Sequence, residues 1–112
     1  MVLKVGDYDF NVELENNATV QKLLALLPLN VKMSELNGNE KYYYLDSTLP
    51  TNAQTVKQIA AGDIMLWGNN CLVIFYKSFT SGYAYTRLGH IADITNLATA
   101  LGGGNVQVVW TR

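Results

Sequence analysis

Residues 64–76 read Ile-Met-Leu-Trp-Gly-Asn-Asn-Cys-Leu-Val-Ile-Phe-Tyr, and this stretch decides the fold class. Two runs of β-branched, aliphatic and aromatic residues, 64–67 and 71–76, surround a Gly-Asn-Asn segment. Runs of this composition are typical of buried strands, and glycine and asparagine favour the tight turn between them. The stretch therefore predicts a β-hairpin in a mainly β protein.

Similar patterns lie toward the N-terminus. Residues 31–36 and 41–45 surround Asn37-Gly38, a pair that tolerates the positive φ of a tight turn. Residues 2–5 and 8–14 form another pair, and the longer run alternates apolar and polar side chains with the period of a half-buried strand. These patterns predict two more hairpins.

Two short helices are predicted from apolar stripes. Apolar residues recur at i, i+3, i+4 and i+7 within residues 18–27 and again within residues 94–101. Asn17 and Asp93 precede these segments, and both residue types are favoured N-caps. A proline ends the first predicted helix, and the glycines at 102–104 end the second.

The remaining segments add two strands and a long connection. Residues 83–87 and 106–110 alternate in the manner of strands, and Gly89 predicts an interruption or bulge after the first. Residues 48–61 are polar and contain a proline, which predicts a long connection that could include a helical turn.

About eight strands and two short helices in 112 residues predict a single domain over residues 1–112. Short strands joined by tight turns favour a sheet that closes into a barrel, because closure removes exposed strand edges. We expect the helices to cover the open ends.

The composition argues against several classes of protein. Eight Lys and Arg residues against nine Asp and Glu give a net charge of −1, which does not suit a nucleic-acid-binding surface. With one cysteine and one histidine, we expect no disulfide, metal site or cofactor. No apolar stretch approaches the roughly 20 residues that span a membrane. We also expect no signal peptide and a cytoplasmic location.

Several stretches, in order, carry a family resemblance: Leu27-Pro28, MSELNGNEK at 33–41, Leu49-Pro50, AGDIMLW at 61–67, LVIFY at 72–76 and YTRLGHI at 85–91. This series resembles the bacterial cyclophilin-like proteins over nearly the whole chain, and the resemblance implies a closed cyclophilin-like β-barrel. True cyclophilins isomerise X–Pro bonds in a hydrophobic pocket, where an arginine polarises the amide. Their characteristic Gly-rich and Asn-Gly-Ser-Gln-Phe-type stretches do not occur here, so no catalytic residue is carried over.

Six residues make up the predicted ligand site: Tyr42, Tyr44, Trp67, Tyr85, Arg87 and His90. Tyrosine offers a flat apolar face and a polar tip, which suits a binding groove but also a barrel core or rim. An arginine fork can hold a carboxylate or phosphate or polarise a carbonyl, and its alternative is a structural ion pair. Histidine titrates near neutrality and could act as a general acid or base, or form a structural hydrogen bond.

Other polar residues are expected to have structural roles. Asp63 follows a glycine at a strand start, where a carboxylate caps the turn. Cys71 opens an apolar strand and is expected to be a buried, inert thiol. Glu40 and Asp46 flank the tyrosine-rich strand and could pair with Lys41 or Arg87.

Three functions remain open at this point. The first is a binding module that holds a small molecule or short peptide in a surface groove or at a barrel mouth, without efficient prolyl isomerase activity. The second is an interaction partner of another bacterial enzyme, which would use exposed aromatic residues as its interface. The third is a peptidyl-prolyl cis-trans isomerase, by analogy of fold alone.

Overall fold

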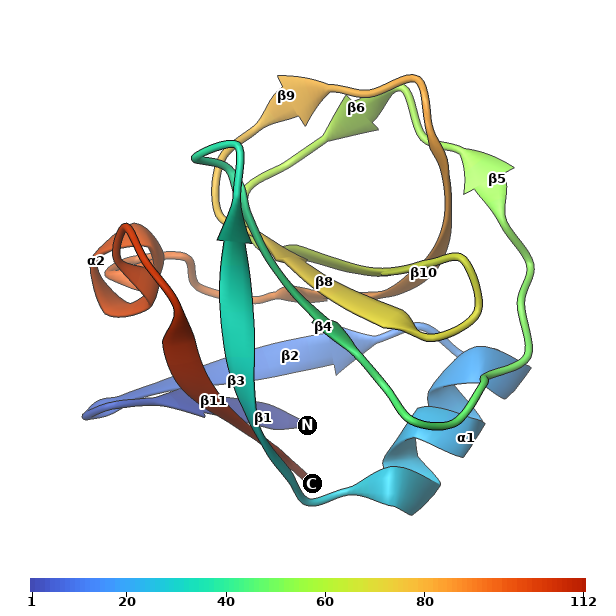
Figure 1. Ribbon diagram of the computed structural model, residues 1–112, viewed down its shortest axis with the longest axis horizontal. Helices are drawn as coiled ribbons and strands as arrows, with labels where there is room; N and C mark the ends of the chain where they lie inside the picture. Colours follow the sequence, from blue (N-terminus) through green and yellow to red (C-terminus); the bar gives the residue numbers. More distant parts are fainter.

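Eight antiparallel strands close into a barrel in the computed structural model, which describes residues 1–112 (Figure 1). The barrel strands are β1 (Val2–Val5), β2 (Tyr8–Leu14), β3 (Leu29–Leu36), β4 (Glu40–Tyr44), β7 (Asp63–Trp67), β8 (Cys71–Phe75), β10 (Ala84–Ile91) and β11 (Val106–Thr111). Their order is β2-β1-β11-β3-β4-β8-β7-β10, and β10 pairs with β2 to close the barrel. The prediction of a closed barrel of about eight strands is confirmed.

Three very short strands lie outside this closed sheet. β5 (Gln54–Thr55) pairs with the start of β10, and β6 (Gln58–Ile59) pairs with β9 (Phe79–Thr80). The connection over residues 48–61 therefore contains two short strands, and the helical turn allowed for it is absent. Its backbone groups instead bond to the distant segment that precedes β10, as in the 3.0 Å bond from the Ser81 N–H to the Lys57 carbonyl.

The two helices are α1 (Ala18–Leu26) and α2 (Leu97–Leu101). As predicted, Asn17 caps α1, and its side-chain oxygen accepts from the Val20 N–H at 2.8 Å. α2 is shorter than predicted, because Asp93 accepts from the Thr95 N–H in a separate turn before the helix. Both helices contribute buried leucines to the barrel core. Neither helix is long and apolar enough to cross a membrane.

The apolar residues form two clusters on opposite sides of one part of the sheet. The larger has 21 buried residues, including Leu72 and Ile74, and fills the barrel. The smaller has seven, including Val73 and Phe75, and lies on the outer face of the barrel beneath β5, β6 and β9. Strand β8 is thus buried on both faces, which explains why its sequence is continuously apolar instead of alternating.

The predicted irregularity at Gly89 is a change of register in β10. The pairing of β10 with β7 shifts between Arg87 and Gly89. A Cβ atom on Gly89 would lie 2.3 Å from the Glu13 carbonyl oxygen of β2. Only glycine therefore allows β2 and β10 to approach this closely at the seam of the barrel.

Candidate functional site

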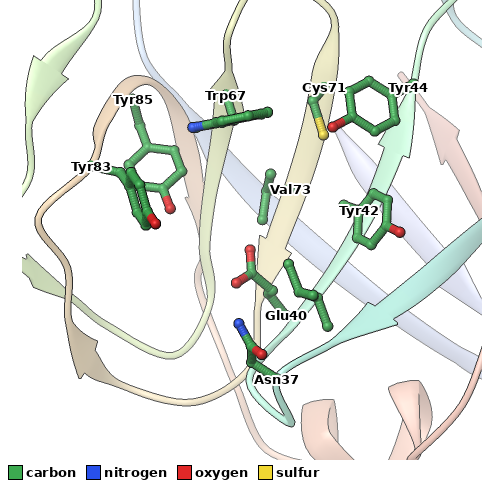
Figure 2. Close-up of a pocket in the computed structure, with 10 residues that line it drawn as sticks. Asn37, Glu40, Tyr42, Tyr44, Trp67, Cys71, Val73, Tyr83 and Tyr85 are labelled. Carbon is green, nitrogen blue, oxygen red and sulfur yellow. The ribbon is translucent and has the colours of Figure 1, made fainter.

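A groove of about 340 Å³ lies on the outer face of the barrel, over β4, β8 and β7 (Figure 2). We call it the aromatic groove. Ten residues line it, eight of them hydrophobic: Leu36, Asn37, Glu40, Tyr42, Tyr44, Trp67, Cys71, Val73, Tyr83 and Tyr85. Four of the six predicted site residues are among them.

Strand alternation brings these side chains to one surface. Tyr42 and Tyr44 point outward from β4, whereas Tyr43 packs against the barrel core, because successive side chains of a strand lie on opposite faces. Tyr44 is paired with Cys71 of β8, which is paired in turn with Trp67 of β7. These three paired residues therefore form a row of side chains across three adjacent strands, and this row is part of the groove surface.

Aromatic rings stand on both sides of the groove. Figure 2 shows Tyr83 and Tyr85 on one side and Tyr42 and Tyr44 on the other, with Trp67 between them at one end. The rings of Tyr42 and Tyr44 meet edge to face, with centroids 5.9 Å apart. Tyr83 is 66% exposed and Trp67 43% exposed, so these two large side chains form a rim that solvent reaches.

Two ionisable groups at the floor of the groove are shielded from water. Burial raises the pKa of the Cys71 thiol to about 11, and the residue is buried, as predicted. Glu40 is only 8% exposed, and burial, together with the nearby Glu35, raises the pKa of its carboxyl group. Neither Glu40 nor Asp46 forms an ion pair with Lys41 or Arg87. Lys41 is buried and bonds Glu35 and the Gly102 carbonyl instead.

A model of the cyclophilin-like family matches residues 3–111. The chain belongs to the cyclophilin-like family. The matched residues run from β1 to β11, so they include the whole closed barrel and the groove on its outer face. No curated protein and no solved structure gives a significant match to the chain.

This cyclophilin-like protein does not bring Arg87 or His90 into the aromatic groove. Arg87 lines a separate, mostly polar hollow next to the groove, and Tyr85 contributes to both hollows. The Arg87 guanidinium makes no ion pair. His90 lies farther along β10, where its Nε2 atom is 2.7 Å from a carboxylate oxygen of the exposed Glu13. The six predicted residues therefore do not form one site.

Glu40 and Tyr83 also line the groove of this cyclophilin-like barrel, although neither is among the six predicted site residues. Glu40 has the same strand parity as Tyr42 and Tyr44, and that signal could have placed it on the same face. Tyr83 shares the parity of Tyr85 in the same way. Asp63 accepts from the Ala60 N–H at 2.9 Å, which confirms its predicted role in a turn. No three His, Cys, Asp or Glu side chains come together as possible metal ligands.

Proposed function

We propose that the protein is a binding module that holds a small molecule or short peptide in the aromatic groove. The observation that carries this proposal is the aromatic rim, in which Tyr44, Trp67 and Tyr83 keep large ring surfaces exposed around a hollow. The volume of the hollow is about 340 Å³, within the range of small-ligand sites. Rings that are exposed around a concave surface offer apolar contact area without a large loss of conformational freedom.

The composition of the groove favours binding over prolyl isomerisation. The isomerases of the wider fold polarise the amide with an arginine, and no arginine lines this groove. The internal arginine, Arg87, belongs to the neighbouring polar hollow. We therefore propose that the protein is not an efficient isomerase. A model peptide with an X–Pro bond tests this, because a large acceleration of its isomerisation would contradict the proposal.

The exposed rim also supports a second candidate, an interface for a protein partner. Leu36 and Tyr44 are 43% and 51% exposed, and together with Trp67 and Tyr83 they surround the groove. Tyrosine and tryptophan are enriched at the centres of protein interfaces. Co-purification of a specific protein, lost on substitution of Trp67, would favour this candidate.

A thermal-shift screen against metabolites, cofactors and proline-containing peptides tests the binding proposal. A ligand at 100 times its Kd should stabilise the protein by about 2.7 kcal/mol, which raises Tm by several degrees in a domain of this size. Trp67→Ala should abolish the shift, because the indole forms part of the rim. Arg87→Ala, which alters the neighbouring hollow, is the matched control and should keep it. If no compound changes the Tm of the folded protein, the result would favour the interface for a protein partner.

A further inference from the structure

Glu40 is the one charged side chain that lines the aromatic groove. Figure 2 shows its carboxylate directed into the groove, between Tyr42 on one side and Tyr83 and Tyr85 on the other. The residue is more than nine-tenths buried, at 8% exposure. Its carboxylate nevertheless has no ion-pair partner and accepts no hydrogen bond.

A buried carboxylate without a partner is unusual. Moving a charged group out of water is unfavourable unless hydrogen bonds or an opposite charge compensate, and buried polar groups in native proteins nearly always have a partner. The adjacent lysine, Lys41, is on the opposite face of β4 and bonds Glu35 at 2.9 Å. The chain therefore supplies no cation to Glu40, and a positively charged group bound in the groove would provide one.

The rings around Glu40 favour the same kind of partner. The faces of tyrosine and tryptophan carry negative electrostatic potential and attract cations, most strongly where water is excluded. Five aromatic residues line the groove: Tyr42, Tyr44, Trp67, Tyr83 and Tyr85. A negative carboxylate and several ring faces thus act on one small volume, and both disfavour an anionic ligand.

We propose that the aromatic groove binds an organic ligand with a primary ammonium group, which donates hydrogen bonds to Glu40 while its hydrocarbon part lies against the rings. Charge-assisted hydrogen bonds of this kind are stronger than neutral ones. The proposal rests on the binding function above and specifies its ligand class. The ammonium group could belong to a free amine or to a lysine side chain of a short peptide.

Isothermal titration of the full chain with three matched probes tests this inference. Phenethylammonium, 2-phenylethanol and 3-phenylpropionate share a phenyl ring on a short chain and carry a positive, zero or negative charge. We expect phenethylammonium to bind at least about tenfold more tightly than the alcohol, and the carboxylate to bind most weakly. Acetyl-Gly-Lys-Gly-amide and its norleucine counterpart show whether a peptide lysine is accepted as the source of the ammonium group.

Glu40→Gln keeps the shape of the side chain and removes its charge. In this variant the affinity for phenethylammonium should fall most of the way toward that for 2-phenylethanol, because only the attraction of the rings remains, while the affinity for the alcohol is unchanged. Glu13→Gln is the matched control, because Glu13 is exposed on β2 beside His90 and does not line the groove. Circular dichroism and thermal unfolding establish that both variants are folded, and the comparison of probes on the unaltered chain needs neither variant.

The possible failures are distinguishable. If the alcohol or the carboxylate binds as tightly as both ammonium probes, the ligand class is wrong. If the preference for the ammonium group survives Glu40→Gln undiminished, Glu40 is not the residue that recognises it. In either case the inference fails, whereas the groove remains a binding site. If no probe and no screened compound binds, the proposed binding function fails together with this inference.

Discussion

At the scale of single residues, the Lys41 side chain is completely buried, and its ammonium group holds two distant parts of the chain together. Its Nζ atom lies 2.9 Å from a Glu35 carboxylate oxygen and 3.0 Å from the Gly102 carbonyl oxygen. Burial opposes ionisation of Glu35, but hydrogen bonds from Tyr76, Lys41 and the Gly38 N–H outweigh it and lower the pKa of this carboxyl group. The Glu35 carboxylate is therefore ionised at neutral pH, and the contacts of Lys41 link the end of α2 to the β3–β4 hairpin.

Lys41→Met should destabilise the protein strongly. The substitution leaves Glu35 without its counter-ion and removes the donor to the carbonyl groups after α2. Loss of one partner of a buried ion pair typically lowers the free energy of unfolding by about 3–5 kcal/mol. Urea unfolding measures this loss, and Lys4→Met, at the exposed Lys4–Asp9 pair, should change stability by less than about 1 kcal/mol. Equal effects of the two substitutions would contradict a stabilising role for Lys41.

Unlike Lys41, Glu40 should lower the stability of the folded protein at neutral pH, and the size of this effect should depend on pH. Its pKa in the folded protein is raised above the ordinary value of 4.5, so the folded state favours the protonated form. The contribution of Glu40 to stability is therefore fully present below pH 4.5 and is lost as the pH rises through the raised pKa.

Glu40→Gln should thus raise Tm at pH 7, and the difference from the unaltered protein should shrink as the pH is lowered toward 4. Thermal unfolding of both proteins at several pH values measures this difference. The other acidic group that acts on this carboxyl is Glu35, and it is unchanged in the variant. A variant that is less stable than the unaltered protein at pH 7 would show that the Glu40 carboxylate has a stabilising partner.

At the scale of secondary-structure elements, the seam between β2 and β10 depends on one glycine. Gly89→Ala would place a Cβ atom 2.3 Å from the Glu13 carbonyl oxygen and 3.1 Å from the Leu14 Cα atom. Both are backbone atoms of a paired strand, so they cannot move aside without a loss of pairing. We expect a destabilisation of about 3 kcal/mol or more, measured by urea unfolding.

Gly103→Ala is the control for this prediction. A Cβ atom at Gly103 would meet nothing within 4 Å, and its φ does not lie in the left-handed region. Alanine there should leave stability unchanged or raise it by up to about 1 kcal/mol, because it restricts the unfolded chain. If Gly89→Ala is as well tolerated as Gly103→Ala, β2 and β10 do not pair closely at this point.

Elements with local signals could be predicted from the sequence, and those with long-range causes could not. The hairpin of β7 and β8 and the cap of α1 at Asn17 follow from neighbouring residues. The strands β5 and β6 do not, because each exists only through pairing with a segment 20 or more residues away. Similarly, alternation along β4 is a local signal that places Tyr42 and Tyr44 on one face. The polar hollow that contains Arg87 is formed with residues of β5, and the pairing of β5 with β10 is a long-range contact.

At the scale of the whole molecule, two apolar clusters of unequal size share one sheet. The barrel cluster has 21 buried residues inside a closed ring of strands, whereas the outer cluster has seven and is covered by β5, β6 and β9. We call these three short strands the cover. Phe75 connects the cover to the aromatic groove, since its ring lies 5.5 Å from that of Phe79 and 5.6 Å from that of Tyr85. The cover has little pairing of its own, because β6 and β9 are two residues long.

The small size of the outer cluster and the short strands over it predict that the cover opens while the barrel remains folded. Regions with few buried contacts and little pairing open at a lower free energy than the core. We expect the amides of β6 and β9 to exchange with deuterium at least about 100-fold faster than those of β7 and β8, which corresponds to a difference of about 2.7 kcal/mol in opening free energy. Native-state hydrogen exchange followed by NMR measures both sets in one experiment. Equal protection would mean that cover and barrel unfold only together. In that case Tyr85, which packs on Phe75 beneath the cover, would be as fixed as the barrel itself.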